Sequence, residues 1–93
     1  MKSHTTERFR EAFGRLPPTV QQRAHAAYRL FGGDPSHPSL RFKRVHASRP
    51  IYSVRIGLGY RALRVRDKDV VIRFWIGSHA AYNRLLQDVG GAL

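Results

Sequence analysis

The residues best suited to chemistry in this chain are arginines in its middle third and a histidine–tyrosine pair near its end. Residues 35–66 contain eight Lys or Arg residues and no Asp or Glu. The guanidinium of arginine is planar, stays charged and can bind a phosphate through two parallel hydrogen bonds. His79 and Tyr82 are three residues apart, so on a helix they point to the same side, where the imidazole could accept a proton. This combination predicts a surface that holds a polyanion, and we expect RNA.

The composition limits where such chemistry takes place. The 93 residues carry a net charge of +11 and are 42% hydrophobic, which indicates one folded domain, residues 1–93, with an acidic partner. There is no cysteine, and the histidines have no carboxylate at ligand spacing, so we expect no metal and no cofactor. No apolar stretch is long enough to span a membrane, and the first residues, MKSHTTERFREAF, lack the apolar middle of a signal peptide. We therefore expect a cytoplasmic protein without a membrane partner.

The basic stretch alternates between apolar and polar residues, as β-strands do. The expected strands are residues 40–45, 51–56, 60–66 and 70–76. A three-residue turn at Gly57-Leu58-Gly59 would place Ile56 opposite Tyr60 and Arg55 opposite Arg61. A second three-residue turn, at residues 67–69, would place Arg61 opposite Trp75 and Leu63 opposite Arg73.

This register predicts which side chains share a face of the sheet. Arg55 and Arg61 would repel each other at a cost of roughly 0.2–1 kcal/mol, and no acid in the segment offsets it. Either both extend into solvent or an anion binds between them. Trp75 either stacks on a base or an arginine, or is a partly buried structural residue. The polar face would carry Ser53, Arg55, Arg61, Arg73 and Trp75, along with Leu63, Val65 and Val71. The core face would carry Val54, Ile56, Tyr60, Ala62, Ile72, Phe74 and Ile76.

Helices flank the strands on both sides in the sequence. Thr6 can cap a helix that begins at Glu7, and Pro18 suits the first turn of a second helix that stops at Gly32-Gly33. Ser78 can cap a last helix, whose free N–H groups and positive dipole end favour an anion beside His79. These elements predict an α+β fold in which an N-terminal αα-hairpin packs on a four-stranded antiparallel sheet with a C-terminal helix.

Residues 51–82, IYSVRIGLGYRALRVRDKDVVIRFWIGSHAAY, resemble the RelE/ParE superfamily of toxins from type II toxin–antitoxin systems. The matching features are a basic strand that ends in arginine, a G-x-Y-R-x-L strand and a hydrophobic strand closing on I-G-x-H. A tyrosine follows in the last helix. The preceding αα-hairpin and the LRFKRV strand fit the family order as well. In contrast to the family, a strand before the αα-hairpin is expected to be missing.

The resemblance implies a toxin that a cognate antitoxin protein neutralises. In its RelE-like branch, the toxin enters the ribosome and cleaves mRNA without a metal. The residues that the resemblance assigns to catalysis are Arg55, Arg61, His79 and Tyr82. Those expected to hold the substrate are Ser53, Arg73, Trp75, Lys43 and Arg44. Ser53 stands where RelE has a lysine, and Arg73 has no firm counterpart in the family and is included for its expected place on the polar face.

The chemistry that these residues could support is transesterification of RNA. A base would take the proton of the 2′-hydroxyl, this oxygen would attack the adjacent phosphate, and an acid would protonate the leaving 5′ oxygen. DNA lacks the 2′-hydroxyl and would not be cut. Two other functions stay open: inhibition of DNA gyrase through protein contacts, as in ParE-like toxins, and binding of nucleic acid without catalysis.

Overall fold

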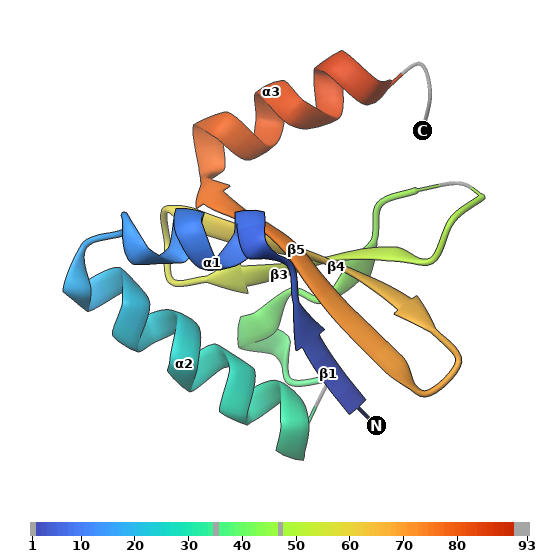
Figure 1. Ribbon diagram of the computed structural model, residues 1–93, viewed down its shortest axis with the longest axis horizontal. Helices are drawn as coiled ribbons and strands as arrows, with labels where there is room; N and C mark the ends of the chain where they lie inside the picture. The colour runs from blue at the N-terminus through green and yellow to red at the C-terminus, as the bar shows by residue number, and fades with distance from the viewer. Residues whose placement is uncertain (1, 35, 47, 91–93) are drawn as a thin grey trace.

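The computed structural model of the protein describes residues 2–34, 36–46 and 48–90. Figure 1 shows α1 and α2 together beside the sheet, and α3 leaving the end of β5 apart from them. The described helices include none that is long and apolar enough to cross a membrane. The elements in chain order are β1 (Lys2–Thr5), α1 (Glu7–Gly14), α2 (Pro18–Gly33), the 3-10 helix η1 (Pro38–Leu40), β2 (Lys43–Arg44), β3 (Ile51–Ile56), β4 (Tyr60–Asp67), β5 (Val70–Ser78) and α3 (His79–Gly90).

The expected helices are confirmed, together with the residues that begin them. The Thr6 hydroxyl accepts a hydrogen bond from the Phe9 amide at 3.1 Å and caps α1. Pro18 occupies the first turn of α2, where its missing N–H costs nothing. The Ser78 hydroxyl accepts from the Ala81 amide at 3.1 Å and begins α3. The α+β class is therefore confirmed, and the end of β5 fixes the start of α3.

The number of strands was predicted wrongly. In the part of the chain that the structure describes, the sheet has five strands in the order β1-β5-β4-β3-β2, and β1 pairs in parallel with β5. The strand before the αα-hairpin, which was expected to be missing, is therefore present as β1. Its sequence, KSHT, has none of the alternation of apolar and polar residues by which a strand is recognised. An edge strand can form without this pattern when its backbone pairs with that of a neighbouring strand. The strand expected at residues 40–45 is reduced to Lys43–Arg44, since Leu40 ends η1 and Arg41 is left-handed, with φ 44°.

The first hairpin has the expected register. Ile56 pairs with Tyr60 and Arg55 pairs with Arg61 across a three-residue turn. Gly57 in this turn has φ 63°, a conformation that glycine adopts without strain. The turn therefore fixes β3 against β4 as its sequence predicted.

The register of the second hairpin was predicted wrongly. Asp67 pairs with Val70, so the turn has two residues rather than three, and Lys68 at φ 53° takes its left-handed position. A β-bulge between Leu63 and Arg64 shifts the pairing again. As a result Arg61 lies opposite Gly77, Leu63 opposite Trp75, and Arg64 opposite Arg73.

The shift by one residue near the turn moves part of β5 to the other face of the sheet. Arg73, expected on the polar face, lies on the face that α1 and α2 cover. Ile72 and Phe74 are only half-buried and do not join the core that was expected to contain them. The buried core consists of Phe9, Val20 and Ala24 from the helices, Leu40 from η1, and Val54, Ile56, Ala62 and Ile76 from the sheet.

Candidate active site

A cleft of about 430 Å³ lies between α3 and the face of the sheet opposite α1 and α2. Ser53 from β3 and Arg61 from β4 form its sheet side, and His79 and Tyr82 from α3 form its helix side. Lys43 closes it from β2. The structure thus brings together five of the nine side chains that the sequence singled out. The full lining is Arg41, Phe42, Lys43, Ser53, Arg61, His79, Tyr82, Asn83 and Leu86.

Arg61 is the cation at the centre of this surface. Its Nη1 donates to the Tyr60 carbonyl at 2.9 Å, which holds the guanidinium against the sheet. Partial burial lowers the pKa of Arg61, the positive charges of Arg55 and Arg41 lower it further, and Tyr82 acts in the opposite direction. The cations around Arg61 make an anion in the cleft favourable.

Tyr82 brings a buried hydroxyl to the same cleft. The residue is 4% exposed, and its hydroxyl makes no hydrogen bond within the described residues. Its ring lies 6.3 Å from that of Trp75 and 6.1 Å from that of His79, nearly parallel to the latter at 18°. These contacts fix the ring, so Tyr82 is a packed residue whose buried hydroxyl has no hydrogen-bond partner among the described residues.

The position of His79 is set by the first hairpin. Its backbone N–H donates to the Gly59 carbonyl at 2.7 Å, which joins the start of α3 to the turn between β3 and β4. The imidazole itself is exposed. This contact and the pairing of Arg61 with Gly77 together set the spacing between Arg61 and His79.

Ser53 and Lys43 lie opposite each other across β2 and β3 and both line the cleft. Ser53 is 1% exposed, whereas Lys43 is exposed. A mobile ammonium at the rim attracts an anion without imposing geometry on it. Lys43 is therefore suited to positioning a polyanion, and Ser53 to forming the floor beneath it.

Trp75 borders the cleft without lining it. Its partner across the sheet is Leu63 rather than Arg61. The indole folds over Gly77, the residue opposite Arg61, so closely that a Cβ on Gly77 would lie 2.9 Å from two of its ring atoms. Gly77 thus makes room for Trp75, and Trp75 in turn packs on Tyr82.

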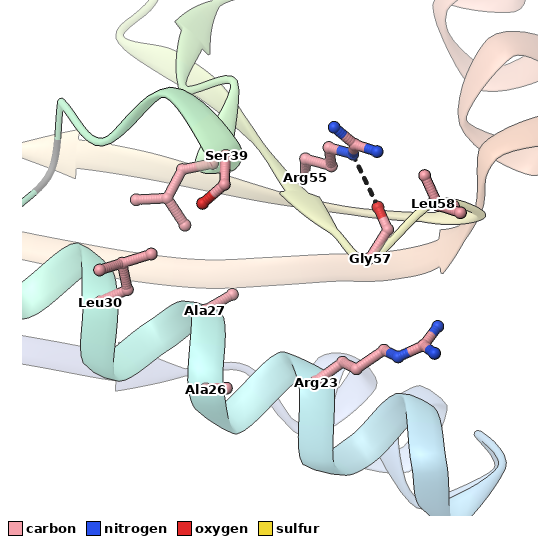
Figure 2. Close-up of a pocket in the computed structure, with 9 residues that line it drawn as sticks. Arg23, Ala26, Ala27, Leu30, Ser39, Arg55, Gly57 and Leu58 are labelled. Carbon is pink, nitrogen blue, oxygen red and sulfur yellow. Dashed lines mark hydrogen bonds between the residues drawn. The ribbon is translucent and has the colours of Figure 1, made fainter.

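Arg55 lies opposite Arg61 but points elsewhere. Its Nε donates to the Gly57 carbonyl at 2.9 Å, and the side chain lines a separate hollow beside α2 (Figure 2). Arg23 of α2 and the exposed Leu58 border the same hollow. Arg55 therefore acts on the cleft through its charge on Arg61 rather than by lining it.

Two residues expected to hold the substrate do not reach the cleft. Arg73 lies on the other face of the sheet, with its guanidinium carbon 3.8 Å from the centre of the Tyr28 ring. Arg44 pairs with Tyr52, one position away from the Ser53 face, and its Nε donates to the carbonyls of His46 and Arg49 at 3.1 and 3.3 Å. Arg73 was expected at the cleft because the register of β4 and β5 was predicted wrongly. Arg44 points away from the cleft because successive side chains of a strand alternate between its two faces.

Sequence reasoning missed two polar residues of the lining, Arg41 and Asn83. Arg41 belongs to the acid-free basic stretch, but its left-handed backbone, which turns the chain toward the cleft, has no signature in the sequence. Asn83 follows Tyr82 directly and could have been found from helix geometry alone. The described residues contain no group of three His, Cys, Asp or Glu side chains that could hold a metal ion.

Comparison with known proteins gives a family and a fold. A family model described as a ParE-like toxin domain matches residues 18–84. A chain of the RelB–RelE antitoxin–toxin complex from Methanococcus jannaschii is similar with a TM-score of 0.70 at 15% identity, over 87% of this chain and 95% of that chain. The isolated RelE toxin of E. coli gives 0.66 at 16% identity, over 95% and 97%. YafQ from E. coli gives 0.68 at 10% identity, over 87% and 96%. No curated protein matches the sequence.

Proposed function

The chain belongs to the ParE-like toxin domain family, within the RelE/ParE superfamily of type II toxin–antitoxin toxins, and we propose that it is a ribosome-dependent endonuclease that cleaves mRNA and so blocks translation. The observation that carries this proposal is the shared cleft of Arg61, His79 and Tyr82. A fixed cation and two groups able to move protons are what cleavage of a phosphodiester requires.

The cation requirement follows from the charge that develops at phosphorus. Attack of the 2′-oxygen produces a phosphorane whose equatorial oxygens carry more negative charge than the diester. Arg61 is held by the sheet and can donate two parallel hydrogen bonds to such oxygens. Lys43 and Arg41 add positive charge at the rim, where the strand of RNA would enter.

The proton transfers fall to the two residues of α3. His79 at the exposed rim takes the proton of the 2′-hydroxyl, and this oxygen forms a bond to phosphorus. The P–O bond to the 5′ oxygen breaks, and the Tyr82 hydroxyl gives its proton to that leaving oxygen. The products are a 2′,3′-cyclic phosphate and a 5′-hydroxyl end. The Tyr82 hydroxyl makes no hydrogen bond within the described residues, so its proton is not engaged elsewhere, and entry of the substrate has to uncover this buried oxygen for the role.

The partners that this function requires are a cognate antitoxin protein, the ribosome and mRNA in the cytoplasm. Solved relatives of the fold include antitoxin–toxin complexes of RelB and RelE. An acidic antitoxin segment would be attracted by the net charge of +11. We propose that it competes with RNA for the cationic cleft.

The proposal is tested by expressing the protein in bacterial cells and mapping the 5′ ends of mRNA. We expect new ends inside translated codons for the wild type and for Arg29→Ala, which removes an exposed arginine of α2 away from the cleft. They should disappear with Arg61→Ala and Tyr82→Phe. Intact mRNA together with double-strand DNA breaks would contradict the nuclease and indicate gyrase inhibition. Absence of toxicity would indicate binding without catalysis.

A further inference from the structure

Two arginines are covered on the face of the sheet that carries α1 and α2. Arg64 of β4 is 3% exposed and lies opposite Arg73 of β5. The guanidinium carbon of Arg64 is 4.1 Å from the centre of the Phe31 ring, and that of Arg73 is 3.8 Å from the centre of the Tyr28 ring. Within the described residues, Arg64 Nε and Nη1 are buried and make no hydrogen bond, and neither arginine forms an ion pair.

Such a pair is costly for the fold. Aromatic rings attract a cation, but they do not satisfy its N–H groups. Burial, followed by the charge of Arg73, lowers the pKa of Arg64 to about 10, which shows how poorly this environment solvates the cation. A leucine or methionine would fill the same position without that cost. The stability of the fold therefore does not explain an arginine at position 64.

Arg64 lines a cavity of about 340 Å³ between the C-terminal half of α2 and the sheet. This cavity lies on the opposite face of the sheet from the cleft of Arg61, and Phe42, just before the edge strand β2, lines both. Arg64 and Arg66 are its cations, and rings form most of the remaining wall. The full lining is Ser3, Tyr28, Phe31, Gly32, Phe42, Tyr52, Arg64, Arg66 and Val71.

The walls limit what can enter. Phe42 and Tyr52 are stacked on each other at 4.8 Å, and Arg64 already covers a face of Phe31. The rings are thus engaged with their neighbours rather than set out to stack a base. An RNA phosphate is flanked by two riboses, which cannot follow it to a guanidinium that is 3% exposed. A carboxylate at the end of an amino-acid side chain is thin enough to do so, and its methylene groups suit the aromatic wall.

We propose that this cavity, with Arg64 at its floor, binds an aspartate or glutamate side chain of a partner protein, presented on a segment with apolar neighbours. The carboxylate would accept hydrogen bonds from the Arg64 guanidinium where it lines the cavity, while Arg66 at the exposed end of the strand would attract the approaching segment. This site does not depend on the nuclease function. Because it lies on the other face of the sheet, a partner could hold the protein here while the Arg61 cleft stays open.

The test is an NMR titration of the full-length protein with the blocked peptide acetyl-Leu-Glu-Leu-amide. We expect the Arg64 Nε–H resonance to shift with the glutamate peptide. The matched peptide with Gln in place of Glu should bind at least tenfold more weakly. Arg64→Met should reduce binding of the glutamate peptide to the level of the Gln peptide, with Arg29→Ala binding as wild type.

Several results would overturn the proposal. Equal binding of the Glu and Gln peptides would remove the carboxylate from it, and an unchanged Arg64 resonance would remove the site. A shift of that resonance with a short oligoribonucleotide but not with the peptide would make the ligand RNA. If Arg64→Met did not fold, the Glu and Gln comparison on the wild type would decide alone.

Loss of mRNA cleavage in Arg61→Ala with the peptide still bound would show that the two sites are separate.

Discussion

The two faces of the sheet use the same residue type in opposite ways. Arg61 and Arg64 are three residues apart in β4, so strand alternation sends them to different faces. Arg61 lines an open cleft with Tyr82 and His79, whereas Arg64 lies under α2 against Phe31. Both lack an acidic partner within the described residues, where the one ion pair joins Arg15 and Glu11.

The difference teaches that positive charge alone does not identify a site. Arg61 is partly exposed and has neighbours that can move protons, so an anion bound there can react. Arg64 is desolvated and has rings around it, so an anion bound there can only be held. We therefore propose the cleft as the place for chemistry and the covered cavity as a place for attachment.

The largest effect expected is that of Arg61→Ala on RNA cleavage. Loss of a fixed donor to the developing phosphorane should slow cleavage about a hundredfold or more. The free energy of unfolding should change little, because no ion pair is lost and the repulsion from Arg55 is relieved. Cleavage on programmed ribosomes and thermal melting measure the two quantities. Cleavage by Arg61→Ala at the rate of the Arg29→Ala control would place the chemistry elsewhere.

Tyr82→Phe should separate packing from chemistry within one side chain. The ring that packs on Trp75 stays, so stability should be unchanged or slightly higher, since the buried hydroxyl makes no hydrogen bond within the described residues. Cleavage should fall roughly a hundredfold through loss of the proton donor. A variant that melts much earlier but cleaves normally would make Tyr82 a purely structural residue.

Gly77→Ala tests how closely the cleft face is packed. A methyl group there would lie 2.9 Å from the Trp75 ring, and forcing the ring aside should cost about 1–3 kcal/mol of the free energy of unfolding. Gly59→Ala is the matched control, because nothing lies within 4 Å of the added Cβ. Chemical denaturation of both variants gives the difference. Equal stability would mean that Trp75 is not held over Gly77.

Arg64→Met should have the smallest effect, and of opposite sign. Replacing the buried cation by an apolar side chain of similar size should raise the free energy of unfolding by about 1 kcal/mol at neutral pH. The folded pKa of Arg64, about 10, lies below the ordinary value of an arginine, so the unfolded chain binds more protons once the pH rises above about 10. Wild-type stability should gain from Arg64 as the pH rises through about 10, and Arg64→Met should lack that gain.

A variant less stable than wild type at neutral pH would contradict this sign. It would mean that the contacts of Arg64 with Phe31 and Tyr28 more than offset the cost of burying it. Arg64 would then be explained by its packing against these rings, and it would no longer indicate a binding site that lowers the stability of the fold.

The sequence predicted the elements whose signals are local. The caps at Thr6 and Ser78 and the proline at the start of α2 are visible in single residues, and the structure confirms all three helices. The turn at Gly57 fixed the register of β3 and β4, and with it the face shared by Ser53 and Arg61. His79 and Tyr82 reach that face because the last helix begins where β5 ends.

What the sequence could not show depends on backbone geometry without a residue signature. The two-residue turn after Asp67 placed Arg73 opposite Arg64, on the face that α1 and α2 cover, and the bulge beside Arg64 then placed Trp75 opposite Leu63. A left-handed Arg41 cut the expected strand 40–45 to two residues and brought an arginine into the cleft. Strand β1 is polar and is held by pairing with β5, which a pattern of hydrophobic residues does not reveal.

The most direct test of the Arg61 cleft as an RNA-cleaving site uses ribosomes programmed with an mRNA that carries one 2′-deoxynucleotide at the mapped cut. We expect the wild-type protein to cleave the all-RNA message, leaving a 2′,3′-cyclic phosphate, and to leave the 2′-deoxy message intact at that position. Tyr82→Phe should cut the all-RNA message slowly at the same place. Equal cleavage of both messages, or no cleavage of either, would contradict the proposed function.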